Sequence, residues 1–300
     1  MPLKKTVFII ALISLASTAV FSIYYKGKSN EKIISPVGYK PTIAEKVSEA
    51  FVPKSELVKL IELRLKDEKG VYGLVIKNLK TGETYVYNEQ AEFTAASLYK
   101  LWVMAVAYEQ INQGNLHETD SVSLSRGKIE ELQGFWEEGV SEDAYYSVAD
   151  AIEQMIVVSD NDSAITLYSN IGVDKIDQFL IASNFTGSGF GSPPKTTPKD
   201  IADYFEKLYK GLIVNRNYSD KMLDLLFKQR LNDRIPQLLP KDVRVAHKTG
   251  ELDTFKHDAG IVELENNDYI LVVLTDTPSP ENAAGVTAQI SKDVYDYFKN

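Results

Sequence analysis

A serine and a lysine three residues apart can carry out acyl transfer when a helix holds them. At that spacing the hydroxyl and the amine lie one helical turn apart on one face, so a neutral amine can take the hydroxyl proton as the oxygen attacks a carbonyl. The chain has this Ser-x-x-Lys spacing four times, beginning at Ser29, Ser97, Ser125 and Ser192. At least three of the four are therefore accidental.

The surrounding sequence singles out the motif at Ser97. Gly127 lies inside the motif at Ser125, and two prolines after Ser192 forbid a helical turn there. Ser29 lies in a polar stretch. Only Ser97 is followed by a strongly apolar segment with a helical pattern, LYKLWVMAVAYEQI. At the start of such a helix the Ser97 N–H is free of helical bonding, and the helix dipole favours a developing oxyanion.

A serine at the start of a helix usually only caps the helix, so the motif at Ser97 alone is weak evidence for a nucleophile. Two further tripeptides strengthen this interpretation. The tripeptide SDN at residues 159–161 follows the helical segment AIEQMIVV. The tripeptide KTG at residues 248–250 ends a predicted strand, VRVAH. Each tripeptide alone is common. Together with Ser-x-x-Lys, in this order, they are the signature of class A β-lactamases and penicillin-binding proteins.

The chain resembles the class A β-lactamases and related penicillin-binding serine hydrolases over most of residues 55–300. Beyond the motifs, several segments are similar to family segments and occur in the family order: YSVADAIEQMIVVSDNDSAITLY, TTPKDIADYFEKL, LPKDVRVAHKTGEL and HDAGIVEL. The resemblance implies a serine hydrolase that forms an ester on Ser97 with a β-lactam or a related acyl donor. It also implies that Lys100 and Ser159 relay the proton of Ser97. We expect the backbone N–H groups of Ser97 and Glu251 to form the oxyanion hole.

Substrate-binding residues follow from the same resemblance. The family pattern implies that Asn161 holds the substrate amide. It implies that Lys248 and Thr249 bind the substrate carboxylate, with Gly250 completing the tripeptide. A cationic Lys248 suits an anion, and it would lower the pKa of Lys100 and so favour the neutral base.

Three features depart from the family pattern. No glutamate occurs in residues 171–199, where family β-lactamases carry the one that activates the deacylating water, and this stretch looks short. Glu251 should weaken the binding of anionic substrates, unless its side chain points to solvent. Ala259 stands where many members have a carboxylate-binding arginine, and Arg234 is either its substitute or a surface arginine at a helix end. Deacylation is therefore expected to be slow.

Two alternative functions share the same serine. Relatives that lack the glutamate include D-alanyl-D-alanine peptidases and esterases that act on cell-wall peptides. A non-turnover module that binds β-lactams and stays acylated is the other. The expected partner is thus a small β-lactam or a peptide containing D-alanine.

A different triad is a weaker hypothesis. His257 and Asp258 invite a Ser-His-Asp interpretation, but neighbouring residues of a strand point to opposite faces and no G-x-S-x-G elbow occurs. Phe135 and Trp136, before the SDN tripeptide, could wall a cleft or pack in the core.

Composition excludes several other classes. The chain has no cysteine and three histidines, which argues against thiol chemistry, a metal centre or a lipidated cysteine, so we expect no metal and no cofactor. A net charge of −9 and a pI near 5.0 argue against nucleic acid as a partner. We expect a monomer.

The N-terminal sequence predicts that the chain is targeted to a membrane. Lys4 and Lys5 precede the uncharged residues 6–25, a length that fits a bilayer core, although residues 17–19 could be a cleavage site. We favour an uncleaved anchor over a signal peptide for residues 1–28. Residues 29–54 are polar and contain prolines, as expected of a tether, and residues 55–300 form the hydrolase domain outside the cytoplasmic membrane.

Hydrophobic patterns predict an α+β fold. Strand patterns occur near both ends of the domain, at residues 71–77, 83–87, 243–248, 260–263 and 269–274. Residues 97–239 have helical and loop patterns without a convincing strand. These patterns predict an antiparallel sheet built from both ends, flanked by terminal helices and joined to an all-helical lobe, with the site in the cleft between them.

Overall fold

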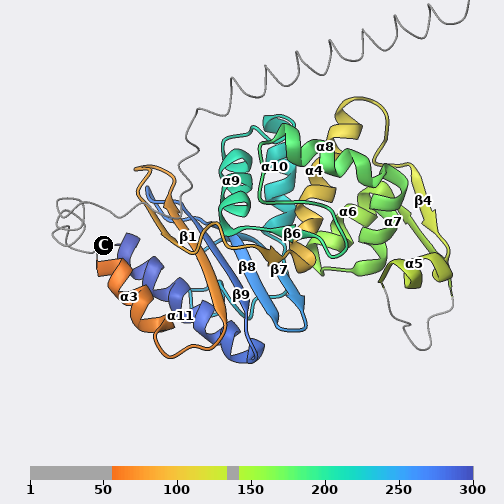
Figure 1. The fold of residues 1–300 in the computed structure, drawn as a ribbon. Helices are drawn as coiled ribbons and strands as arrows, with labels where there is room; N and C mark the ends of the chain where they lie inside the picture. Colours follow the sequence, from red (N-terminus) through yellow and green to blue (C-terminus); the bar gives the residue numbers. More distant parts are fainter. Residues whose placement is uncertain (1–55, 134–141, 300) are drawn as a thin grey trace, which may run out of the picture. The chain divides into compact units, whose positions relative to one another are not determined.

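Two segments of the chain, residues 56–133 and 142–299, are described by the structure, a computed structural model (Figure 1). The predicted anchor (1–28) and tether (29–54) lie outside the described residues, as does the aromatic pair 135–136. Within the two described segments, no helix is both long enough and apolar enough to cross a bilayer.

One antiparallel sheet of five strands joins the two ends of the domain (Figure 1). Its strand order is β2-β1-β9-β8-β7, so the earliest strands pair with the last. The strands are β1 (Val71–Asn78), β2 (Thr84–Tyr87), β7 (Val245–Leu252), β8 (Phe255–Val262) and β9 (Tyr269–Asp276). The predicted α+β fold, with a sheet from both ends of the domain, is confirmed.

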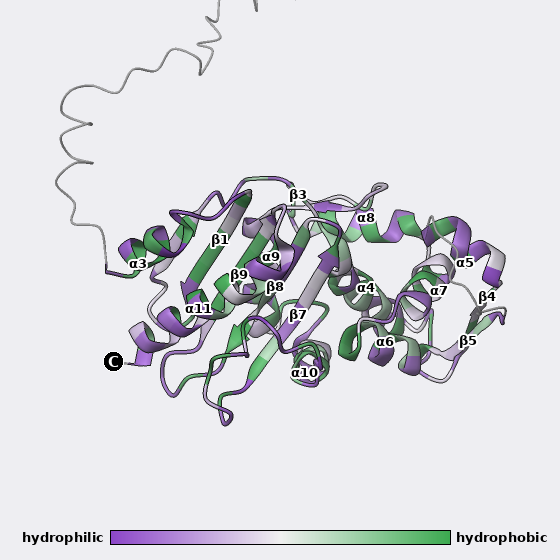
Figure 2. Cartoon of the chain, turned by 90° about the horizontal axis from the view of Figure 1, so that it is seen from below, coloured by the Kyte–Doolittle hydropathy of each residue, from purple (hydrophilic) through white to green (hydrophobic). Residues whose placement is uncertain are grey.

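Helices cover both faces of this sheet. The terminal helices α3 (Glu56–Leu65) and α11 (Pro280–Lys299) pack on each other, and α11 contacts β8 and β9. Helix α9 (Pro198–Tyr209) contacts β1, β8 and β9. Strands β1, β8 and β9 are consequently buried along most of their length, and Figure 2 shows hydrophobic residues along the sheet.

A helical lobe is built around α4. Nearly every residue of α4 is buried, which is why its sequence shows no polar face. The helices of the lobe besides α9 are α4 (Lys100–Asn112), α5 (Arg126–Gln133), α6 (Val148–Val157), α7 (Asn161–Ile171), α8 (Val173–Ala182) and α10 (Arg216–Leu226). Ser147 and Asp160 cap α6 and α7 by accepting a backbone N–H, so both helix starts are set by sequence.

The lobe is not all-helical, which corrects the prediction that no strand lies in residues 97–239. Strands β4 (Ser121–Leu124) and β5 (Ala144–Ser147) pair as an antiparallel ribbon. A second short pair joins β3 (Phe93–Thr94) to β6 (Lys195–Thr196). Strands of two to four residues are too short to show a period of two in the sequence.

The lobe meets the sheet at the turn before α4. This turn, the 3-10 helix η2 (Ala96–Tyr99), contacts β7 and β8. The largest hydrophobic cluster includes α4 residues together with Ala246, Ala259 and Val272 of the sheet, so one core underlies both parts. The position of Ser97 relative to the sheet is therefore set by buried packing.

Candidate active site

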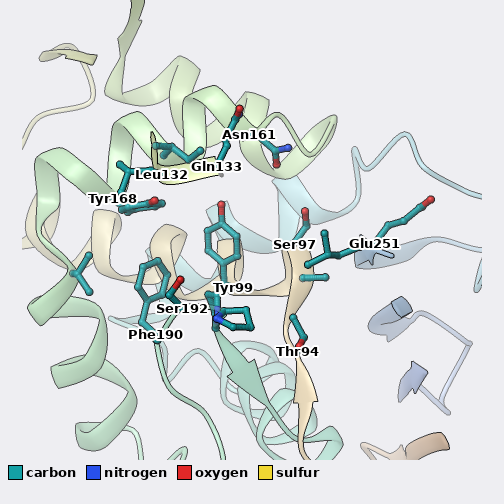
Figure 3. Close-up of a pocket in the computed structure, with 17 residues that line it drawn as sticks. Thr94, Ser97, Tyr99, Leu132, Gln133, Asn161, Tyr168, Phe190, Ser192 and Glu251 are labelled. Carbon is teal, nitrogen blue, oxygen red and sulfur yellow. The ribbon is translucent and has the colours of Figure 1, made fainter. Parts of the chain in front are cut away.

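Ser97 lies on η2, a single tight turn that leads directly into α4. The sequence predicted that Ser97 begins the α-helix itself, whereas the helix begins at Lys100. Ala96, just before the serine, has a φ of +45°, a left-handed conformation that costs a non-glycine residue about 1–3 kcal/mol. The side chain of Leu98 is fully buried and anchors the turn in the core. Packing thus holds a strained backbone that presents Ser97 to the cleft (Figure 3).

Strand β7 runs close to this turn because of Gly250. A Cβ added at Gly250 would lie 3.2 Å from the carbonyl oxygen of Ala95 and from Cγ of Leu98, which is tighter than ordinary contact. The tripeptide 248–250 lies within β7, so the prediction that it ends the strand was wrong. Glu251 lines the same cavity as Ser97, and the oxyanion hole expected from their two N–H groups stays a prediction.

Ser159 links two buried lysines. Lys248 Nζ donates to Ser159 Oγ at 2.9 Å, and Lys100 Nζ lies 3.4 Å from the same oxygen. Lys100 Nζ also donates to the carbonyl oxygen of Ser159 at 2.5 Å and to Asn161 Oδ1 at 2.8 Å. In the described part of the chain no hydrogen bond joins Lys100 to Ser97. The structure therefore brings four of the predicted site residues together at one point.

The link between α6 and α7 positions Ser159. Ser159 has a φ of +62°, and the next residue, Asp160, accepts the backbone N–H of Ser163 at 2.7 Å as the cap of α7. This left-handed residue between two helices turns the chain sharply. The turn places the carbonyl and hydroxyl of Ser159 and the side chain of Asn161 on the Lys100 amine.

Burial shifts the protonation of both lysines. Desolvation lowers the pKa of Lys100 to about 7, and only the nearby Asp160 acts in the opposite direction. Desolvation, followed by repulsion from Lys100, holds the pKa of Lys248 well below its ordinary value. The sequence predicted that Lys248 depresses the pKa of Lys100, whereas burial is what lowers it, and the repulsion between the two amines acts on Lys248. Near neutral pH, Lys100 can be a neutral base.

Thr249 is the least informative of the predicted residues. It is buried, and its carbonyl oxygen accepts a hydrogen bond from Lys248 Nζ at 2.9 Å. In the β7–β8 pair it lies opposite Asp258. The predicted contact of Thr249 with a substrate carboxylate stays a prediction.

A cavity of about 440 Å³ opens beside Ser97 (Figure 3). Asn161 and Gln133 border it from the helical lobe. Its other residues are mainly apolar: Tyr99, Leu132, Ile165, Tyr168, Val173, Phe190, Pro193 and Pro194. The ring of Phe190 packs edge-on against Tyr99 and Tyr168, with centroids 5.5 and 5.2 Å apart. An acyl donor at Ser97 would therefore meet an apolar wall.

The stretch without glutamate forms part of this wall. Within residues 171–199, Phe190 and the following four residues line the cavity, and none of them is acidic. Ser192 lies here, yet its Ser-x-x-Lys partner, Lys195, donates to Glu92 at 2.5 Å. Residues 192–194 are not helical, so rejecting Ser192 as the motif serine agrees with the structure.

Arg234 is buried, so its interpretation as a surface arginine was wrong. Only 1% of its side chain is exposed, and it lies in a turn after α10. It donates to Glu251 Oε2 at 2.6 Å and to the carbonyl oxygen of His257 at 3.1 Å. Lys256, which the sequence analysis did not single out, binds the same Glu251 oxygen at 2.9 Å. Of the two alternatives for Glu251, neither a free acid in the cleft nor a side chain free in solvent is found: the carboxylate is half-exposed and held by two cations.

The histidines do not form a catalytic triad with Ser97. The ring of His257 is hydrogen-bonded to the carbonyl oxygen of Thr94 at 2.8 Å and accepts the N–H of Thr275 at 3.0 Å. Burial lowers its pKa to about 4, which keeps it neutral. Asp258 contacts His247 at 2.9 Å instead, on the adjacent strand. The rejection of a His257–Asp258 pair is thus consistent with the structure, and the buried His247–Asp258 pair went unnoticed in the sequence.

Comparison with known proteins agrees with this geometry. The model of the β-lactamase enzyme family matches residues 54–298. The chain therefore belongs to the β-lactamase enzyme family. No curated protein sequence matches it.

Solved structures show the same fold. The structure of PBP-A has a TM-score of 0.75 at 22% identity and covers 82% of this chain and 97% of its own. A β-lactamase from Sphaerobacter thermophilus has a TM-score of 0.73 at 20% identity, covering 82% of this chain and 98% of its own. The TLA-3 extended-spectrum β-lactamase has a TM-score of 0.73 at 22% identity, covering 81% and 98%. These likenesses establish the fold.

Proposed function

We propose that the chain is a serine hydrolase that works through an acyl-enzyme on Ser97. The observation that carries the proposal is Ser159, whose hydroxyl lies between two buried amines beside the cavity that Ser97 lines. A neutral Lys100 is a base one helical turn from Ser97. Buried amines with lowered pKa values are typical of sites that transfer protons.

Acylation can be written with these residues alone. Ser97 Oγ attacks the carbonyl carbon of the donor while Lys100 accepts the hydroxyl proton. The developing oxyanion is stabilised by backbone N–H groups, as predicted for Ser97 and Glu251. When the C–N bond breaks, Ser159 donates its proton to the leaving nitrogen and is reprotonated by Lys100. Lys248, donating to Ser159 Oγ, leaves the Ser159 hydroxyl proton free to point at that nitrogen.

Deacylation lacks an obvious base, so we propose that it is slow. Glu251 is the only carboxylate among the described residues that line the cavity, and Figure 3 shows its side chain extending away from Ser97. Partial burial raises the Glu251 pKa, but hydrogen bonds from Lys256 and attraction by Arg234 outweigh this and lower it. A carboxylate so stabilised is a weak base for water. Lys100, after the proton returns through Ser159, is the remaining candidate.

The acyl donor in this proposal is a β-lactam or a D-alanyl peptide. One similar structure is described as an acyl-enzyme complex of a PBP-A variant with penicillin G, which makes a penicillin the natural probe. A cell-wall peptidase, esterase or non-turnover β-lactam-binding module is the alternative, and the non-acidic cavity wall at residues 190–194 favours such slow turnover. We further propose that residues 1–28 anchor the chain and that the domain works outside the cytoplasmic membrane.

Labelling with a fluorescent penicillin tests the proposal. The wild-type chain should become covalently labelled, and Ser97→Ala should lose the label completely. Ser192→Ala is the matched control, because Ser192 lines the same cavity and has the same motif spacing, and it should keep the label. Rapid loss of label would identify an efficient β-lactamase, and long-lived label one of the alternatives. An unlabelled wild type, or label that survives Ser97→Ala, would overturn the assignment.

A further inference from the structure

A second pair of buried cations lies at the end of β7. Arg234 is 1% exposed and Lys256 is 3% exposed, and both bind the carboxylate of Glu251. Their distances to Glu251 Oε2 are 2.6 and 2.9 Å. Glu251 itself is 55% exposed at its side chain and borders the cavity beside Ser97. Two buried positive charges thus bind the same carboxylate, that of Glu251, at the rim of the cleft.

The charges around this point do not favour another anion. Asp233 lies 3.4 Å from Arg234 and 3.9 Å from Lys256. Glu281 lies 3.1 Å from Lys256. Three carboxylates therefore face two cations, so this group of charged residues at the rim of the cleft has a net negative charge. A carboxylate that arrives from solvent meets like charges before it meets Arg234 or Lys256.

We infer that Glu251 occupies the anion-binding position formed by Arg234 and Lys256, and thereby selects for acyl donors that carry no carboxylate at that end. The inference rests on the proposed acylation of Ser97 and specifies the class of donor. Favoured donors are uncharged there, as in an ester or a C-terminal amide.

The cost to an anionic donor has two sources. To reach Arg234 and Lys256, the carboxylate must displace two charge-assisted hydrogen bonds that Glu251 already makes. If it does not displace them, it lies close to the negative charge of Glu251. The KTG lysine offers little compensation, because Lys248 Nζ already donates to Ser159 Oγ and to the carbonyl oxygen of Thr249, each at 2.9 Å.

A matched pair of donors tests this selectivity. The donors are a penicillin and its methyl ester, which differ in the charge of one carboxyl group, and the measurement is the second-order rate constant for acylation of Ser97. The wild type should favour the ester or acylate both at similar rates. Glu251→Gln should raise the acid-to-ester ratio by about tenfold, because it removes the competing charge. Glu251→Asp, which keeps the charge, should stay near the wild-type ratio.

Glu281→Gln is the control for a general change in the local electrostatic potential, because it removes a nearby negative charge outside the cavity. Glu281 also binds Lys256 but is 84% exposed and does not line the cavity, so its ratio should change by less than about twofold. An unchanged ratio in Glu251→Gln, or equal shifts in both variants, would overturn the inference while Ser97 is still acylated. The inference would also be overturned if the wild type reacted about tenfold faster with the acid than with the ester, a measurement that needs no variant. If neither donor acylated Ser97, the proposed function would instead be overturned, and the inference with it.

Discussion

Two pairs of buried cations, each with one member on the paired strands β7 and β8, behave differently. Lys100 and Lys248 are fully buried and donate only to neutral oxygens of serine, threonine and asparagine. Arg234 and Lys256 are equally buried, but each binds the Glu251 carboxylate. Desolvation of an amine without a counter-ion lowers the pKa of that amine, whereas a carboxylate partner stabilises the charged form of a cation. The first pair can therefore move protons, and the second fixes a charge pattern.

The largest expected effect separates these pairs by truncation. Lys100→Ala should slow acylation by the uncharged donor by several orders of magnitude, about 10⁴-fold or more, because it removes the base that we propose for Ser97. Lys256→Ala should slow it by less than about tenfold, since Arg234 still holds Glu251. Stopped-flow acylation kinetics measure both. Equal losses in the two variants would show that the pairs do not have distinct roles.

The next effect concerns the second half of the reaction. With Glu251 bound by cations and no glutamate in residues 171–199, the lysine pair is our remaining candidate, among the described residues, for activating water. A missing general base should make turnover of a good penicillin about 10²–10⁴-fold slower than in an efficient β-lactamase, with a pre-steady-state burst. Hydrolysis of a chromogenic cephalosporin reports the burst. Fast turnover without one would mean that a carboxylate, with Glu251 the first to test, does activate the water.

The site formed by Lys100 and Lys248 could be predicted from sequence, whereas the shared contact of Arg234 and Lys256 with Glu251 was not. Ser97, Lys100 and Lys248 belong to short motifs whose residue types already imply chemistry. The partnership of Arg234 depends on how a turn after α10 folds back onto β8, which local sequence does not encode. A usable signal did exist for Lys256. A tight turn at residues 253–254 would place Lys256 opposite Glu251 as a cross-strand ion pair, which is the observed register.

The same difference applies to the fold. Long apolar patterns predicted the sheet from both ends, because strands such as β9 are buried on both faces. The ribbon of β4 and β5 was missed because each strand has only four residues. The extent of β7 was also missed. It continues through the KTG tripeptide to Leu252 because β8 pairs with it there, and such pairing is a tertiary event.

A smaller effect is expected from pH. In the proposed mechanism acylation needs neutral Lys100, whose pKa is about 7, so the rate should rise about tenfold per pH unit well below pH 7 and level off above it. From pH 5 this amounts to roughly 50-fold by pH 7 and roughly 100-fold on the plateau. Stopped-flow acylation at constant ionic strength measures the profile. Rates that do not change between pH 5 and 8 would mean that a carboxylate, and not Lys100, is the general base. The distinction between the two cation pairs would then be lost.

The smallest effect is on stability, and the two pairs should differ in sign. The pKa of Lys100 falls from 10.5 to about 7 on folding. Between these pH values the unfolded chain binds the proton more tightly, so wild-type stability rises with pH in this window and the full cost of the charge is present below pH 7. Lys100→Met removes that cost. It should raise the free energy of unfolding by about 1–3 kcal/mol at pH 6, and by less at pH 10.

Arg234→Met should do the opposite. Loss of the Arg234 guanidinium removes hydrogen bonds to the carbonyl oxygen of His257 and to Glu251. The free energy of unfolding should therefore fall by about 1–3 kcal/mol, with little dependence on pH between 6 and 10. Urea denaturation of both variants at the two pH values makes the comparison. If Lys100→Met destabilised the fold at pH 6 as much as Arg234→Met does, the Lys100 amine would be a structural partner of Ser159 and Asn161 and not a base held at a cost in stability.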